Sequence, residues 1–110
     1  MEISEIMTLI AVSINGIKIR ITKERLKHIL ENHPEIKGME HLILETIENP
    51  DLILEGDYEE YLAVKKYLKT PVSENKYLVV VYREFENDGF VITAYFTRRY
   101  SKRRKIIWKP

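Results

Sequence analysis

Histidine is scarce in this chain, and two of its three histidines fall in one predicted helix. His33 continues the apolar stripe of that helix, whereas His28 lies on another side of it. An imidazole can give or take a proton near neutral pH, so each is a candidate general acid or base. Two alternatives stay open: His33 can be a hydrogen-bonded core residue, and His28 can be an exposed surface group.

Hydroxyl groups alternate along the strand that we predict over residues 90–97. One side of this strand carries Val91, Thr93, Tyr95 and Thr97. The other side, which we expect to face the core, carries Phe90, Ile92, Ala94 and Phe96. Tyr61 and Lys65 should share the hydroxyl side if the strands pair as a meander. Aromatic rings stack on unpaired RNA bases and cations neutralise phosphates, so this face is an RNA-binding candidate. Thr and Tyr are also common on the solvent face of any sheet, and that alternative stays open.

The charge of the chain reverses near its end. All 17 acidic residues precede position 98, which leaves the first 97 residues with a net charge of −6 and the remainder with +7. The cationic residues of this basic segment are Arg98, Arg99, Lys102, Arg103, Arg104, Lys105 and Lys109. Such a segment suits a polyanion such as RNA, although a solvated tail has the same composition.

These residue types match what metal-free RNA cleavage requires. A base takes the proton of the 2′-hydroxyl, cations stabilise the phosphorane, and an acid protonates the departing 5′-oxygen. The composition permits this chemistry without selecting it. The candidates that it offers are catalytic (His28, His33, Tyr95, Thr97, Arg98) and RNA-binding (Thr93, Tyr61, Lys65, Arg99, Lys102, Arg103, Arg104). Cysteine is absent and the histidines do not pair on one helical face, so we expect no metal site. Without a glycine-rich phosphate loop, we expect no cofactor.

The elements that would position these residues follow from periodicity and turn chemistry. Asn15-Gly16 predicts a hairpin turn with positive φ at both residues, between strands over 6–14 and 17–21. Helices are predicted over 23–33, with Thr22 as N-cap, and over 39–48. The later strands are predicted over 52–54, 58–68, 77–86 and 90–97, with a loop over 70–75. The fold class is α+β, with the N-terminal hairpin and two helices packed on one face of a four-stranded antiparallel sheet.

Length and composition indicate one domain, residues 1–110, with the basic segment 98–110 at its end. The apolar stretch over 6–12 is too short to span a membrane, and Glu2 and Glu5 precede it where a signal peptide needs cations. We expect a cytoplasmic protein without a membrane partner. The 15 isoleucines and the lack of glutamine lean towards a heat-adapted, thermophilic source.

Five segments in order resemble the barnase–EndoU–colicin–RelE-like nuclease superfamily, in particular its phage-associated branch. They are residues 26–36, Asn49-Pro50-Asp51, residues 77–81, residues 91–95 and Ile107-Trp108, and together they extend over most of residues 22–108. His28 and His33 match the family's helix motif, and Thr93, Tyr95 and Thr97 match its terminal-strand motif. Where relatives tend to have a lysine-glycine turn before the final Ile-Trp, this chain has residues 102–105, Lys-Arg-Arg-Lys.

The resemblance implies helices packed on a four-stranded antiparallel sheet, and metal-independent RNA cleavage, often by a toxin that a partner protein neutralises. Our leading hypothesis is accordingly a RelE/barnase-like endoribonuclease acting on single-stranded or ribosome-associated RNA, and its partner would be an antitoxin. The alternative is a non-catalytic RNA- or protein-binding module that uses the same sheet face and basic segment. A third hypothesis makes the basic segment the docking surface for an acidic, antitoxin-like protein.

Overall fold

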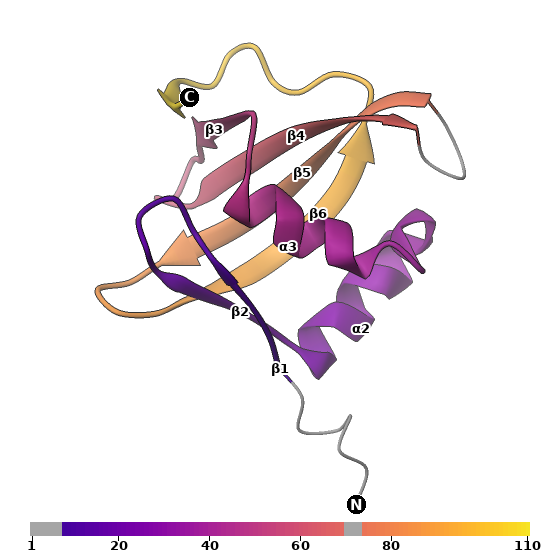
Figure 1. The fold of residues 1–110 in the computed structure, drawn as a ribbon, viewed down its shortest axis with the longest axis horizontal. Coiled ribbons are helices and arrows are strands. Elements are labelled where there is room, and N and C mark those ends of the chain that lie inside the picture. The colour runs from indigo at the N-terminus through magenta and orange to yellow at the C-terminus, as the bar shows by residue number, and fades with distance from the viewer. Residues whose placement is uncertain (1–7, 70–73) are drawn as a thin grey trace, which may run out of the picture.

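The computed structural model describes residues 8–69 and 74–110 and contains one seven-stranded mixed sheet with strand order β1-β2-β6-β5-β4-β3-β7. Figure 1 shows α3 lying across the strands and α2 lying beside β6. The elements are β1 (Thr8–Val12), β2 (Lys18–Thr22), α2 (Lys23–Asn32), the short 3₁₀ helix η1 (Pro34–Ile36), α3 (Glu40–Glu48), β3 (Leu52–Glu55), β4 (Tyr61–Lys69), β5 (Glu74–Glu84), β6 (Gly89–Thr97) and β7 (Ile106–Trp108). No helix in these two ranges is long and apolar enough to cross a membrane.

The predicted four-stranded antiparallel sheet is wrong, although the α+β class holds. Strands β3 to β6 pair antiparallel, but β2 of the N-terminal hairpin joins β6 in parallel, at Ile19↔Gly89 and Arg20↔Phe90. At the other edge β7 pairs with β3. Both additions are pairings between segments far apart in the chain, which local periodicity does not encode.

The helix boundaries confirm the capping and proline signals. The Thr22 hydroxyl accepts a hydrogen bond from the Arg25 amide at 3.1 Å, and α2 ends immediately before the His33-Pro34 step. α3 ends at Asn49, where the sequence turns towards Pro50. Buried isoleucines from both helices (Ile29, Ile43 and Ile47) pack against strand residues in the main hydrophobic core.

The first turn differs from its prediction in backbone geometry. The Gly16 amide donates to the Ser13 carbonyl, and the Ser13 amide donates to the Ile17 carbonyl, each at 2.9 Å. Gly16 has φ +80°, but Asn15 does not take a positive φ. The turn is therefore a type I turn followed by a glycine bulge, which needs only one left-handed residue. Residues 6 and 7 of the predicted first strand, like residues 70–73 of the predicted loop, lie outside the described residues.

The central strands are buried on both faces. Ala63, Val80 and Ala94 lie opposite one another and belong to the main core under the helices, which we call the helix face. Their neighbours Val64, Val79 and Tyr95 also lie opposite one another, on the other side. They belong to a second apolar cluster with Leu54 and Leu62, and we call this side the helix-free face.

A bulge in β6 corrects the predicted alternation of its first half. Val81 pairs with Thr93 but Tyr82 pairs with Val91, so Ile92 is an extra residue in β6. Val91 is consequently buried in the main core, while Phe90 is 40% exposed. Beyond the bulge the prediction holds, because Ala94 and Phe96 face the helices and Tyr95 does not.

The basic segment returns to the sheet instead of extending into solvent as a tail. Residues 98–105, which we call the crossing segment, connect the end of β6 to β7 at the far edge of the sheet (Figure 1). Tyr100 packs against the second apolar cluster, and the Glu55 amide donates to the Lys105 carbonyl at 2.9 Å. The crossing segment therefore contacts the helix-free face.

Candidate active site

An imidazole and a phenol meet at the edge of β6. The ring centroids of His33 and Tyr95 lie 5.9 Å apart, and the ring planes are tilted by 36°. Tyr95 is half-buried near the C-terminal end of β6, and His33 caps the C-terminal end of α2 with a side chain that is 32% exposed. The contact thus joins a helix end to a strand residue that points away from the helices.

The route of α2 explains this contact. β2 pairs with β6 only at Gly89 and Phe90, so the edge of β6 beyond these residues does not pair with β2. α2 lies along that edge, and Arg25 Nη1 donates to the Ile92 carbonyl at 3.3 Å. Because α2 runs beside the strand, its last turn delivers His33 to the level of Tyr95.

A carboxylate accompanies the imidazole. Nδ1 of His33 lies 3.7 Å from Oε2 of Glu35, which is too long for a hydrogen bond but close enough for an ion pair when the imidazole is protonated. Glu35 belongs to η1, whose first residue Pro34 follows His33 directly. Glu35 therefore lies beside the imidazole without fixing the ring by a hydrogen bond.

One guanidinium of the crossing segment is held in place by neighbouring residues. Arg104 forms a two-pronged ion pair with Asp57, with nitrogen–oxygen distances of 3.1 and 3.2 Å, and also donates to the Glu55 carbonyl. The hydrogen bond to Asp57 is the main cause that raises the pKa of Arg104. These two anchors, at the end of β3 and in the β3–β4 connection, fix its position.

Thr93 and Thr97 of β6 lie on the same face as Tyr95, but their contacts differ. Thr97 Oγ1 donates to the Arg99 carbonyl at 2.8 Å and receives a bond of 3.3 Å from the Arg99 amide. This hydroxyl therefore holds the start of the crossing segment. Thr93 is half-buried beside Val81. The side chains of Arg98, Arg99, Lys102 and Arg103 are exposed along the crossing segment.

The prediction that Tyr61 and Lys65 share the face of Tyr95 is wrong. Lys65 pairs with Leu78 on the helix face, where its Nζ donates to the Asn49 carbonyl at 2.8 Å. Tyr61 lies on the same side. The alternation along β4 was predicted correctly, but both of its faces are apolar or aromatic, so the sequence could not tell which one the helices cover.

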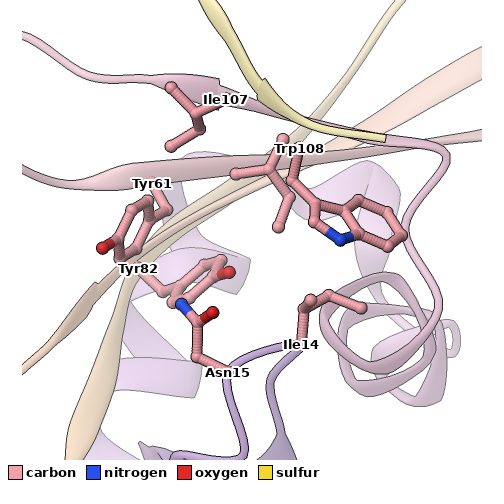
Figure 2. Close-up of a pocket in the computed structure, with 7 residues that line it drawn as sticks. Ile14, Asn15, Tyr61, Tyr82, Ile107 and Trp108 are labelled. Carbon is pink, nitrogen blue, oxygen red and sulfur yellow. The ribbon is translucent and has the colours of Figure 1, made fainter. Parts of the chain in front are cut away.

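Tyr61 instead lines a cavity of about 180 Å³ on the helix side of the sheet (Figure 2). Its ring centroid lies 5.5 Å from that of Tyr82, and Trp108 of β7 closes the cavity near the hairpin residues Ile14 and Asn15. Trp108 thus packs back onto the fold, although it follows a run of four cationic and two apolar residues.

The second candidate histidine lies elsewhere. His28 is exposed and lines a shallow depression on α2 with Thr22, Glu24 and Arg25. Of the two helix histidines, the structure shows a ring contact with Tyr95 for His33, whereas His28 lines this separate depression. In the described ranges no three His, Asp or Glu side chains gather as a metal-binding group would.

Three residues of the helix-free face were missed at the sequence level. Lys66 and Tyr77 lie opposite each other in β4 and β5, and Tyr100 packs beside Tyr77. The sequence did contain a signal for Lys66, because this residue alternates with Tyr61 and Lys65 and so lies on the other side of β4. That side was predicted to face the core, and Lys66 was therefore not considered.

Comparison with known proteins places these residues within one family. A family model described as phage-Barnase-EndoU-ColicinE5/D-RelE like nuclease 2 matches residues 5–109, a range that includes His33, Tyr95 and Arg104. No curated protein and no solved structure matches the chain. The predicted resemblance is confirmed, and the match supports a nuclease-like function acting on nucleic acid. The chain belongs to the phage-Barnase-EndoU-ColicinE5/D-RelE like nuclease 2 family.

Proposed function

We propose that this nuclease-family protein is a metal-independent endoribonuclease with its active site on the helix-free face around His33 and Tyr95. The observation that carries the proposal is the ring contact between these two residues, 5.9 Å between centroids. Arg104, anchored to Glu55 and Asp57, adds a positive charge on the crossing segment, which contacts the same face. Imidazole, phenol and guanidinium are groups that can transfer protons and stabilise a phosphorane.

The proposed reaction is transfer of the phosphate to the neighbouring 2′-oxygen. His33 takes the proton of the 2′-hydroxyl while that oxygen forms a bond to phosphorus. The bond from phosphorus to the 5′-oxygen breaks, and the Tyr95 phenol protonates the departing oxygen. Arg104 stabilises the additional negative charge on the phosphorane oxygens. The products are a 2′,3′-cyclic phosphate and a free 5′-hydroxyl, after which His33 returns its proton to the phenolate through water.

The experiment incubates purified protein with a mixed-sequence RNA in EDTA and identifies the new ends by mass spectrometry. Cleavage should leave 2′,3′-cyclic phosphates, and a single 2′-deoxy substitution at a cleavage site should block cleavage there, because it removes the nucleophile. His33→Ala should lower the rate constant by about 100-fold or more, the usual contribution of a general base. His28→Ala is the matched control, since it removes an exposed imidazole from the same helix.

Full-length RNA after prolonged incubation, or equal rates for the His33 and His28 variants, would overturn the catalytic proposal. A second candidate function, RNA binding without chemistry, is favoured by one observation: the crossing segment contacts the helix-free face and holds the Thr97 hydroxyl in two hydrogen bonds. That function predicts tight RNA binding with no cleavage by any variant.

A toxin role would be one biological use of this activity. It is motivated by the charge distribution, because a segment with seven cationic residues next to the site suits an acidic protein inhibitor as well as RNA. Expression of the wild-type chain, but not of His33→Ala, should arrest growth, and the product of an adjacent gene should relieve the arrest. Growth unaffected by a chain that is active in vitro would reject the toxin role and leave the nuclease proposal intact.

A further inference from the structure

We infer that two tyrosines and two lysines of the helix-free face form a second nucleotide subsite beside the proposed active site. The four residues, which we call the tyrosine–lysine cluster, are Lys66, Tyr77, Tyr100 and Lys102. The inference rests on the proposed function in one respect, namely that the substrate is single-stranded RNA. It adds where the neighbouring nucleotide of that RNA binds.

The rings and ammonium groups of the cluster already contact one another. The Tyr77 and Tyr100 ring centroids lie 5.2 Å apart, with an edge-to-face angle of 84°. Lys102 Nζ lies 3.9 Å from the centroid of Tyr100, and Lys66 Nζ lies 5.9 Å from that of Tyr77. Each ring therefore has a cation above or near it.

Strand register places the cluster next to Tyr95. Tyr77 lies opposite Thr97 in β6, whereas Tyr95 lies opposite Val79, two residues further along β5. Two residues of a strand span about 7 Å, a separation suited to adjacent nucleotides. Tyr100 approaches from the crossing segment and packs in the same apolar cluster as Tyr77 and Tyr95.

The chemistry of the cluster fits a base with its phosphate. Tyrosine rings stack on any base, and lysines neutralise phosphates, which is how proteins bind single-stranded RNA without reading its sequence. Both rings are half-buried and therefore preorganised, while both lysines are exposed. An exposed ammonium group can move from a ring to a phosphate without being desolvated first. Packing against the second apolar cluster explains why the two rings lie here. It does not explain why a lysine ammonium group lies near each ring.

The test measures binding and cleavage separately. Binding of a fluorescent single-stranded RNA is measured in the His33→Ala background, where the oligonucleotide stays intact. Tyr100→Ala should weaken binding about 10-fold, within the range for losing one stacked base. Lys66→Met and Lys102→Met should each reduce the slope of log K against log salt by about 0.7, as expected for one lost phosphate contact. Tyr100→Phe should bind as the wild type does, because it keeps the ring.

Matched controls come from the same chain. Lys27→Met removes an exposed lysine from α2, and Tyr58→Ala removes a ring that is 76% exposed on the β3–β4 connection; neither should change binding. The lysine variants keep the test decisive if Tyr100→Ala fails to fold, because Lys66 and Lys102 are exposed. Salt slopes for Lys66→Met and Lys102→Met equal to that of Lys27→Met would overturn the inference.

Cleavage of short substrates separates this inference from the proposed function. With wild-type catalytic residues, the cluster variants should cleave a dinucleotide as the wild type does but lose about 10-fold in kcat/KM on a trinucleotide extended towards the cluster. If the variants cleave the dinucleotide normally and lose nothing on trinucleotides extended at the 5′ or at the 3′ end, the subsite is rejected and the nuclease is kept. Weakened RNA binding by a protein that cleaves nothing keeps the subsite and rejects the nuclease.

Discussion

The imidazole of His33 lies 5.9 Å from the phenol ring of Tyr95, although the first residue ends a helix and the second faces away from the helices. The contact exists because α2 lies along the edge of β6 beyond the short parallel pairing with β2. The proposed proton-transfer pair is therefore held together by two elements that meet at an edge of the sheet, and it depends on the position of α2.

Tyr95→Phe tests whether the phenol transfers a proton. The substitution removes one hydroxyl and keeps the ring next to His33, so the free energy of unfolding should change little. If the phenol protonates the leaving oxygen, the single-turnover rate constant should fall by about 100-fold or more. Stopped-flow or quenched cleavage of a defined oligonucleotide measures this constant directly.

The control for this prediction is Tyr61→Phe, which removes a phenol on the opposite face of the sheet. Its rate constant should match the wild type. If Tyr95→Phe also cleaves at the wild-type rate, the phenol is not the acid, and the role of Tyr95 is to orient the imidazole or the phosphate.

Asp57→Asn tests the anchor of Arg104. The ion pair is largely exposed, with the Asp57 side chain 69% accessible, so the melting temperature should barely change. Cleavage should fall about 10-fold or more, because a misplaced guanidinium stabilises the phosphorane less well. Asp88→Asn removes the carboxylate of another exposed pair, with Arg20, and should leave cleavage unchanged. Equal activity of the two variants would show that the Asp57 anchor does not matter.

Local chemistry made part of this fold readable from the sequence. α2 begins after the N-cap Thr22 and ends before Pro34. Both signals are local, because a cap and a missing proline amide act within a few residues. Which face of β4 packs against the helices could not be predicted in the same way. Leu62 and Val64 are as apolar as the residues that face the helices, and only the surrounding sheet determines which side is covered.

Long-range pairing limited the prediction of the candidate site as well. Ile106–Trp108 are three apolar residues after a basic run, and their pairing with β3 depends on a partner about fifty residues away. That pairing carries the crossing segment, which includes Arg104, past the helix-free face. The residue types of the site were evident from the sequence, but this arrangement was not.

One buried phenol, that of Tyr82, and one half-buried phenol, that of Tyr67, predict loss of stability at alkaline pH. Burial raises the pKa of both Tyr67 and Tyr82 above the ordinary value, and Glu84 raises that of Tyr82 further. Between about pH 10, where the phenols of the unfolded chain ionise, and the higher pKa values of the folded state, the folded protein binds more protons. Its free energy of unfolding must then decrease as pH rises. Below about pH 10 this contribution is fully present.

Urea denaturation at a series of alkaline pH values measures this slope. Tyr82→Phe cannot ionise at this position and should show a shallower decline above about pH 10 than the wild type. Tyr58→Phe is the control, because that ring is 76% exposed and should not alter the slope. An unchanged slope in Tyr82→Phe would mean that its phenol ionises as readily in the folded protein as in the unfolded chain.

Gly89→Ala tests the junction that sets the path of α2. A Cβ at this position would lie 2.4 Å from the Arg83 carbonyl oxygen and 2.6 Å from Ile19 Cδ1, so β2, β5 or β6 would have to shift. We expect a loss of about 1–3 kcal/mol in the free energy of unfolding, typical of overpacking. Ile19→Val in the same chain removes the side-chain clash but not the backbone clash, so it should recover only part of the loss. Because Gly89 pairs with β2, and β2 leads directly into α2, cleavage per folded molecule should fall too. Wild-type cleavage by a destabilised Gly89→Ala protein would show that α2 holds His33 beside Tyr95 without help from the parallel pairing.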